Sequence, residues 1–157
     1  MPHPFRGTRR LFLLLLPLLT GLVTTGWSQT PLPERLLTPA DLEKVGMKGT
    51  VRPSAEMYDP KEGLHFVRGT DSALVLAVAA PGGGGSLKET VQLLAKDAAP
   101  VAGVADEAYS GLAGWMLMFR KGGTTIQMLT GMDLLTGKVF LSMAQMTELA
   151  KLIVARL

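Results

Sequence analysis

Two stretches of the chain share one plan: two alternating apolar segments, a short glycine-containing connection between them, and an apolar stripe opened by Ser-x-x-Glu or Ser-x-x-Gln. Alternation of apolar and polar residues predicts strands, and a short turn containing glycine predicts a hairpin. Ser followed three residues later by Glu or Gln is a capping box, which predicts the start of a helix. A chain that uses this plan twice is limited to an arrangement of hairpins and helices, the α+β class.

The residue ranges follow from the same signals. Strands are expected at 64–68, 72–79, 115–120 and 124–130. Three helix starts are marked by a cap residue and its partner three positions on: Thr38 with Asp41, Ser86 with Glu89, and Ser142 with Gln145. The order helix, hairpin, helix, hairpin, helix predicts a mostly antiparallel sheet built from two hairpins, with the helices packed on one face.

The first 28 residues have the pattern of a secretory signal peptide. Three arginines precede an apolar run at 11–23, and the small residues Gly26 and Ser28 stand at the −3 and −1 positions of a cleavage site. The run is shorter than the roughly 20 apolar residues that span a bilayer. We therefore expect cleavage after Ser28, a secreted or periplasmic location, and no membrane insertion of the cleaved chain.

Cleavage changes the charge of the chain. The whole sequence has 16 Lys and Arg against 13 Asp and Glu, and three of the arginines precede residue 29. The balanced remainder gives no electrostatic reason to expect nucleic acid as a partner. The sequence contains no cysteine, so the domain must be held by its core instead of disulfides. We expect an extended tether at 29–37, which contains two prolines, and a single domain at 38–157.

One segment resembles a known pattern. The residues Val104-Ala105-Asp106-Glu107-Ala108-Tyr109-Ser110-Gly111, the turn Phe119-Arg120-Lys121-Gly122 and the closing helix at 146–157 are similar to small, uncharacterised exported bacterial domains. In those domains a G-x-G-D-E-A-Y/F turn precedes a hairpin and a C-terminal helix. Ala105 departs from the pattern, because a second glycine is usual there. The resemblance implies an α+β fold for the whole domain and brings no catalytic residue with it.

The adjacent acids Asp106 and Glu107, close to Tyr109, are the clearest candidate for acid-base chemistry. Paired carboxylates can act as acid and base when their surroundings separate their pKa values. Neighbouring residues usually point apart, however, and aspartate commonly binds backbone amides in turns. We therefore interpret these three residues as a structural turn or strand entry, and keep a carboxylate-dependent hydrolase as an alternative.

Other chemistries have weaker support in the sequence. His65 is the only histidine after residue 28, and no Gly-x-Ser-x-Gly elbow accompanies it, so it is expected on the solvent side of a strand. The glycines at 82–85 match no phosphate-binding motif. Eight methionines follow residue 28, and the pairs Met116 with Met118 and Met143 with Met146 could bind Cu(I) through their thioethers. We assign no catalytic residue, metal site or cofactor.

The apolar residues around the second hairpin are the candidate ligand-binding set. Trp115, Met116, Met118 and Phe119 could line an apolar groove, since such sites are mostly hydrophobic. The expected function is a non-enzymatic exported domain that binds an extracytoplasmic protein or a small apolar ligand. The alternatives are a methionine-based Cu(I)-binding protein and the carboxylate-dependent hydrolase.

Overall fold

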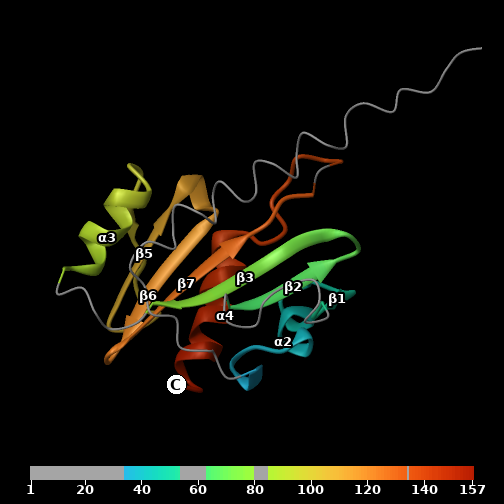
Figure 1. The fold of residues 1–157 in the computed structure, drawn as a ribbon, viewed down its shortest axis with the longest axis horizontal. Coiled ribbons are helices and arrows are strands. Elements are labelled where there is room, and N and C mark those ends of the chain that lie inside the picture. Colours follow the sequence, from blue (N-terminus) through green and yellow to red (C-terminus); the bar gives the residue numbers. More distant parts are fainter. Residues whose placement is uncertain (1–33, 54–62, 80–84, 134) are drawn as a thin grey trace, which may run out of the picture.

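The computed structural model describes residues 34–53, 63–79, 85–133 and 135–157. The predicted signal peptide at 1–28 lies outside these ranges, as do residues 29–33 of the predicted tether. Within the described residues the fold is α+β, with helices packed against a seven-stranded antiparallel sheet (Figure 1). The predicted fold class is therefore confirmed.

The sheet brings the two halves of the chain together. The elements are η1 (Glu34–Leu36), α2 (Pro39–Lys44), β1 (Thr50–Val51), β2 (Leu64–Arg68), β3 (Asp71–Ala79), α3 (Leu87–Leu94), β4 (Ala99–Pro100), β5 (Glu107–Gly111), η3 (Leu112–Gly114), β6 (Met116–Lys121), β7 (Thr124–Thr130) and α4 (Met143–Val154). The strand order is β1-β2-β3-β7-β6-β5-β4, so the halves meet where β3 pairs with β7. The predicted hairpins are β2–β3 and β6–β7.

The helix starts are capped as the sequence predicts. At the start of α3 the side chain of Ser86 accepts a hydrogen bond from the amide of Glu89 at 3.2 Å, and the Glu89 carboxylate accepts one from the amide of Ser86 at 3.3 Å. Ser142 and Gln145 make the same exchange at the start of α4. Helix α3 ends at Leu94, and the next residue, Ala95, has extended backbone angles (φ −145°, ψ 117°).

The larger core lies on one face of the sheet, beneath α2 and α4. Gln145 joins these two helices, because its Nε2 donates a hydrogen bond to the carbonyl of Val45 at 2.6 Å. Leu36 and Leu37 are also buried in this core, so the described part of the predicted tether is folded against the sheet instead of extended. The strand residues that fill this core include Phe66, Leu74, Leu76, Leu117, Phe119, Ile126 and Met128.

Helix α3 covers the opposite face of the sheet. Met116 and Met118 alternate along β6 with Leu117 and Phe119, so they point to the other side and meet the apolar stripe of α3. The expectation that the helices share one face does not hold for this helix. The physical reason is that β6 is apolar on both faces, and a strand of that kind must be covered on both.

Candidate functional site

The four residues predicted to bind a ligand do not share a surface. Met116 and Met118 are fully buried under α3, and Phe119 is fully buried on the opposite face of the sheet. Trp115 stands apart from them, because 37% of its surface is exposed. Three of the four residues therefore form core, and only Trp115 is placed to meet another molecule.

The acids at 106 and 107 fasten β5 to the β6–β7 turn. The Asp106 carboxylate accepts a hydrogen bond from the amide of Gly122 at 2.7 Å and lies 3.0 Å from Nζ of Lys121. The Gly122 amide, followed by Lys121, holds the pKa of Asp106 below its usual value. Glu107 and Tyr109 lie in β5, where Glu107 is 3.8 Å from Arg120. The contacts of Asp106 and Glu107 therefore join the start of β5 to the β6–β7 hairpin.

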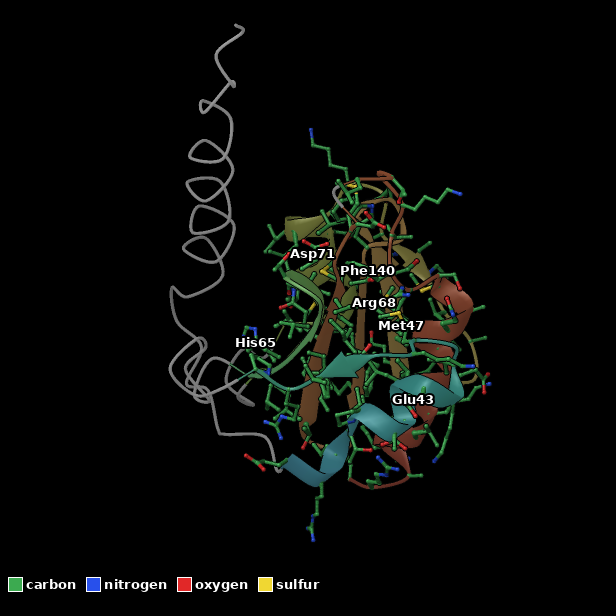
Figure 2. The ribbon with its side chains drawn as sticks, turned by 90° about the vertical axis from the view of Figure 1, so that its right-hand side faces the viewer. Glu43, Met47, His65, Arg68, Asp71 and Phe140 are labelled. Carbon is green, nitrogen blue, oxygen red and sulfur yellow. The ribbon has the colours of Figure 1, made fainter. Side chains whose placement is uncertain are left out.

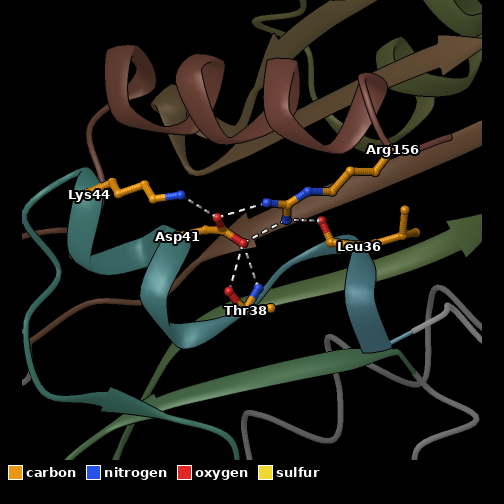
Figure 3. A network of polar contacts seen from close by, with 5 residues as sticks. All are labelled: Leu36, Thr38, Asp41, Lys44 and Arg156. Atoms are coloured by element: carbon orange, nitrogen blue, oxygen red, sulfur yellow. Dashed lines mark hydrogen bonds and ion pairs between the residues drawn. The ribbon is translucent and has the colours of Figure 1, made fainter.

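The single fully buried acid among the described residues is also used structurally. Asp41 is bound by Arg156, Thr38 and Lys44 (Figure 3). In the part of the chain that the structure describes, no three His, Cys, Asp or Glu side chains are placed to hold a metal ion. The thioether of Met116 accepts a hydrogen bond from Nε2 of Gln127 at 3.2 Å, so this methionine is engaged within the protein.

His65 lies on the α3 side of the sheet. Figure 2 shows its ring on the side away from Met47 and Glu43, which belong to the α2 side. Both ring nitrogens are shielded from solvent, so His65 does not occupy the solvent-side position expected from the sequence. Burial, followed by the positive charge of Arg52, lowers the pKa of His65 below 6.5.

Two segments with exposed apolar side chains lie at one end of the β6–β7 hairpin, opposite its tight turn. The segments meet there, because the amide of Thr130 donates to the carbonyl of Trp115 at 3.0 Å and the amide of Phe140 donates to the carbonyl of Gly131 at 3.0 Å. Leu135 is 97% exposed, Val139 38% and Trp115 37%. We call these two segments the loop end, and their exposed apolar residues are Ala113, Trp115, Leu135 and Val139.

The first segment of the loop end has an unusual backbone that Asp97 holds in place. Leu112 and Ala113 have φ angles of 55° and 53°, in the left-handed region that side chains other than glycine rarely adopt. The Asp97 carboxylate accepts a hydrogen bond from the amide of Leu112 at 2.9 Å and another from the amide of Ala113. The Ala113 amide is the main reason that the pKa of Asp97 is lowered. The carboxylate thus fixes the turn that precedes Trp115.

The second segment is held by another aspartate. The Asp133 carboxylate accepts hydrogen bonds from the amides of Leu135 at 2.8 Å and Thr136 at 3.2 Å, and these bonds lower its pKa. The backbone of Asp133 also bonds to Lys138 and Gly137, at 2.9 and 2.8 Å. Figure 1 shows this segment extending past the end of the sheet, just before α4. The side chain of Leu135 is therefore exposed to solvent while its backbone amide is bound by Asp133.

Of the residues at the loop end, only Trp115 was a candidate on sequence grounds. The signal that could have found Leu135 is an apolar pair at 134–135 in a turn-rich stretch, flanked by Asp133 and Gly137. Comparison of the chain with protein-family models, curated proteins and solved structures finds no match. Among the described helices, none has the length and apolar character needed to cross a membrane.

Proposed function

We propose that this protein is an exported, non-enzymatic binding domain whose loop end contacts a partner protein. The observation that carries this proposal is that the exposed residues Trp115, Leu135 and Val139 lie on two segments that meet at one end of the β6–β7 hairpin, each segment held by an aspartate. Exposed apolar side chains grouped on structured loops are typical of interaction surfaces. A backbone that is already fixed loses less entropy on binding, which favours affinity.

The carboxylates support a binding role over the hydrolase alternative. A general acid needs a pKa raised toward neutral pH. Each shifted carboxylate of the described residues instead has a lowered pKa and accepts hydrogen bonds from the protein itself: Asp41, Asp97, Asp106 and Asp133. These groups stay ionised at neutral pH and are engaged in holding the fold.

The shape of the loop end favours a protein over a small apolar ligand. Small-molecule sites are concave and enclose most of the ligand, whereas Leu135 extends outward with 97% of its surface exposed. The methionines of the copper alternative are also unfavourably placed, because Met116 and Met118 are packed under α3. Binding a metal there would require α3 to separate from the sheet.

Export is the other half of the proposal and has its own test. Three arginines, an apolar run and small residues at the cleavage positions support a signal peptide that ends at Ser28. N-terminal sequencing of the protein purified from the extracytoplasmic fraction should begin at Gln29. A protein that starts at Met1 and stays in the cytoplasm would contradict this half of the proposal.

Binding is tested by variants on the loop end and away from it. Three proteins that begin at Gln29 are immobilised separately and exposed to the extracytoplasmic fraction. They are the wild type, the Trp115→Ser/Leu135→Ser double variant and the Leu93→Ser control. Leu93 is a suitable control because it is 88% exposed on α3. A partner retained by the wild type and the control but lost from the double variant supports the proposal. A partner retained equally by all three would contradict the assignment of the loop end.

A further inference from the structure

Residues 112–114 form a left-handed turn, a conformation that is rare for residues other than glycine. Leu112, Ala113 and Gly114 have φ angles of 55°, 53° and 88°. Two of these residues carry a Cβ, and each of them disfavours the left-handed region by roughly 5- to 30-fold. Residues in such rare conformations need support from their surroundings, and they cluster at functional sites and in segments that switch.

The support for this turn comes from one carboxylate. Asp97 accepts hydrogen bonds from the amides of Leu112 and Ala113. It lies two residues after Ala95, which is buried in the apolar cluster beneath α3. Hydrogen bonds to an ionised acceptor are stronger than those between neutral groups, so this pair can offset the preference against the left-handed conformation. The hand of the turn therefore depends on a single exposed side chain in the segment that follows α3.

The turn contacts both α3 and Trp115. The half-buried side chain of Leu112 packs against the apolar cluster beneath α3, and its carbonyl accepts a hydrogen bond from the amide of Trp115 at 3.0 Å. On the preceding side, Gly111 lies so close to the end of α3 that a Cβ there would be 2.6 Å from the Cβ of Ala95. A change of hand in the turn would therefore move Leu112 relative to α3 and Trp115 relative to the sheet.

We propose that Asp97 and residues 112–114 form a two-position conformational switch. With the carboxylate bound, the turn is left-handed and Leu112 packs beneath α3. Without it, the turn relaxes to negative φ, Leu112 withdraws from the cluster, and the side chain of Trp115 becomes more exposed. The competition between backbone strain and the two hydrogen bonds sets the populations of the two positions. The switch is a motion within the chain, so it stands or falls independently of the proposed binding of a partner.

The test compares four proteins that begin at Gln29, in which Trp115 is the sole tryptophan. They are the wild type, Asp97→Ala, the Asp97→Ala/Ala113→Gly double variant and the control Asp106→Ala. Asp106 is a matched control because its exposed carboxylate also binds a turn amide, that of Gly122. Gly122 has a φ of 55°, which costs a glycine little, so no strain is released there.

Three measurements are made on each protein. NMR gives the intraresidue NOE between the amide proton and Hα of Leu112, which is strong only when φ is positive. Quenching of fluorescence by acrylamide reports the exposure of Trp115, and circular dichroism reports the fold.

We expect Asp97→Ala to release the turn and the double variant to restore it. In Asp97→Ala the NOE of Leu112 should weaken at least about twofold, because the amide proton and Hα lie further apart at negative φ. The quenching constant of Trp115 should rise in the same protein. Ala113→Gly lowers the strain of the left-handed turn, so the double variant should return both signals toward wild type. Asp106→Ala should match the wild type in both.

Each other outcome overturns the switch in a distinct way. A strong NOE retained in Asp97→Ala would show that packing, and not the carboxylate, fixes the turn. A weakened NOE with unchanged quenching would separate the turn from Trp115. Failure of Ala113→Gly to restore either signal would mean that strain does not drive the release. If Asp97→Ala is unfolded by circular dichroism, Asp97→Asn, which keeps one acceptor oxygen, takes its place, and unfolding of both would show a purely structural role for Asp97.

Discussion

Asp41 is 1% exposed, and its carboxylate is held by the guanidinium of Arg156, a residue 115 positions further along the chain. The two Nη atoms of Arg156 lie 2.6 and 2.9 Å from the two carboxylate oxygens (Figure 3). Arg156 also donates to the carbonyl of Leu36 at 3.0 Å. The end of α4 is thereby tied to both η1 and α2, and the two ends of the described chain are joined across the larger core.

Loss of the Arg156 side chain should lower the free energy of unfolding. Arg156→Met leaves the Asp41 carboxylate buried without its main partner, and removal of one member of a buried pair costs several kcal/mol. Because a third of the arginine is exposed, we expect a loss of about 2–4 kcal/mol. Urea denaturation measures it. Lys44→Met is the matched control, since Lys44 contacts the same carboxylate but is 65% exposed, and its loss should cost about 0–1 kcal/mol. Equal effects of the two substitutions would contradict the role given to Arg156.

Stability should also fall in acid because of Asp41. The hydrogen bond from Arg156, partly opposed by burial and helped by Thr38, holds the pKa of Asp41 well below its ordinary value of 3.8. A lowered folded-state pKa means that the stabilisation is complete above pH 3.8 and is lost as pH falls below that value. Unfolding midpoints measured from pH 6 to pH 2 should therefore decline, and Asp41→Asn should be less stable at pH 6 with a shallower decline. If the unfolding midpoint of Asp41→Asn declines with pH as steeply as that of the wild type, the acid sensitivity comes from other carboxylates.

The helix starts and both hairpins could be predicted from the sequence because their signals are local. Ser86 and Glu89 are three residues apart, and their hydrogen bonds form whenever the chain turns into a helix there. The glycine-containing turn at 122–123 likewise determines the pairing of its two flanking strands. Even the interpretation of Asp106 as a ligand of backbone amides depends only on a nearby turn.

The features that could not be predicted depend on residues far apart in the sequence. Nothing near Asp41 indicates that Arg156 binds it. The alternation of Met116 and Leu117 shows that β6 is apolar on both faces, but the identity of the covering helix on each face depends on the path of the whole chain. For the same reason, the ligand-binding hypothesis placed Met116 and Met118 at a surface, although both are core residues. Trp115 alone belongs to the loop end, because its strand begins one residue later than expected.

His65 should make stability sensitive to pH in the neutral range. Burial, followed by Arg52, lowers its pKa below 6.5, so the folded protein favours the neutral ring. The resulting stabilisation is complete above pH 6.5 and is lost as pH falls below it. We expect the unfolding midpoint to fall between pH 7.5 and pH 5, and His65→Gln to reduce that dependence. His65 is the only histidine after residue 28, so in a protein that begins at Gln29 its imidazole resonance can be titrated by NMR without assignment. A measured pKa at or above 6.5 would refute the prediction.

The turn before Trp115 should tolerate glycine at position 113. Ala113 has a φ of 53° and is exposed, and the left-handed conformation costs a residue with a Cβ about 1–2 kcal/mol. Glycine removes that cost but makes the unfolded chain more flexible by about 0.4–1 kcal/mol. Ala113→Gly should therefore raise the free energy of unfolding by about 0.5 kcal/mol. The control Ala155→Gly, at an exposed right-handed residue, should lower it, and destabilisation by both substitutions would argue against strain at this turn.

Gly131 should be the glycine least tolerant of a side chain at the base of the loop end. A Cβ at this position would lie 1.6 Å from the carbonyl oxygen of Ser72, so the backbone itself must move to admit alanine. The amide of Gly131 donates to the carbonyl of Ala73 at 2.9 Å, and the displacement would break this link between β3 and the segment after β7. Because a backbone clash cannot be relieved by a rotamer change, we expect Gly131→Ala to cost at least about 3 kcal/mol or to prevent folding.

Gly123→Ala is the matched control, since no atom lies within 4 Å of its Cβ position, and it should change the free energy of unfolding by less than about 0.5 kcal/mol. A urea midpoint of Gly131→Ala close to that of Gly123→Ala would contradict the close approach of the Ser72 carbonyl in β3 to Gly131.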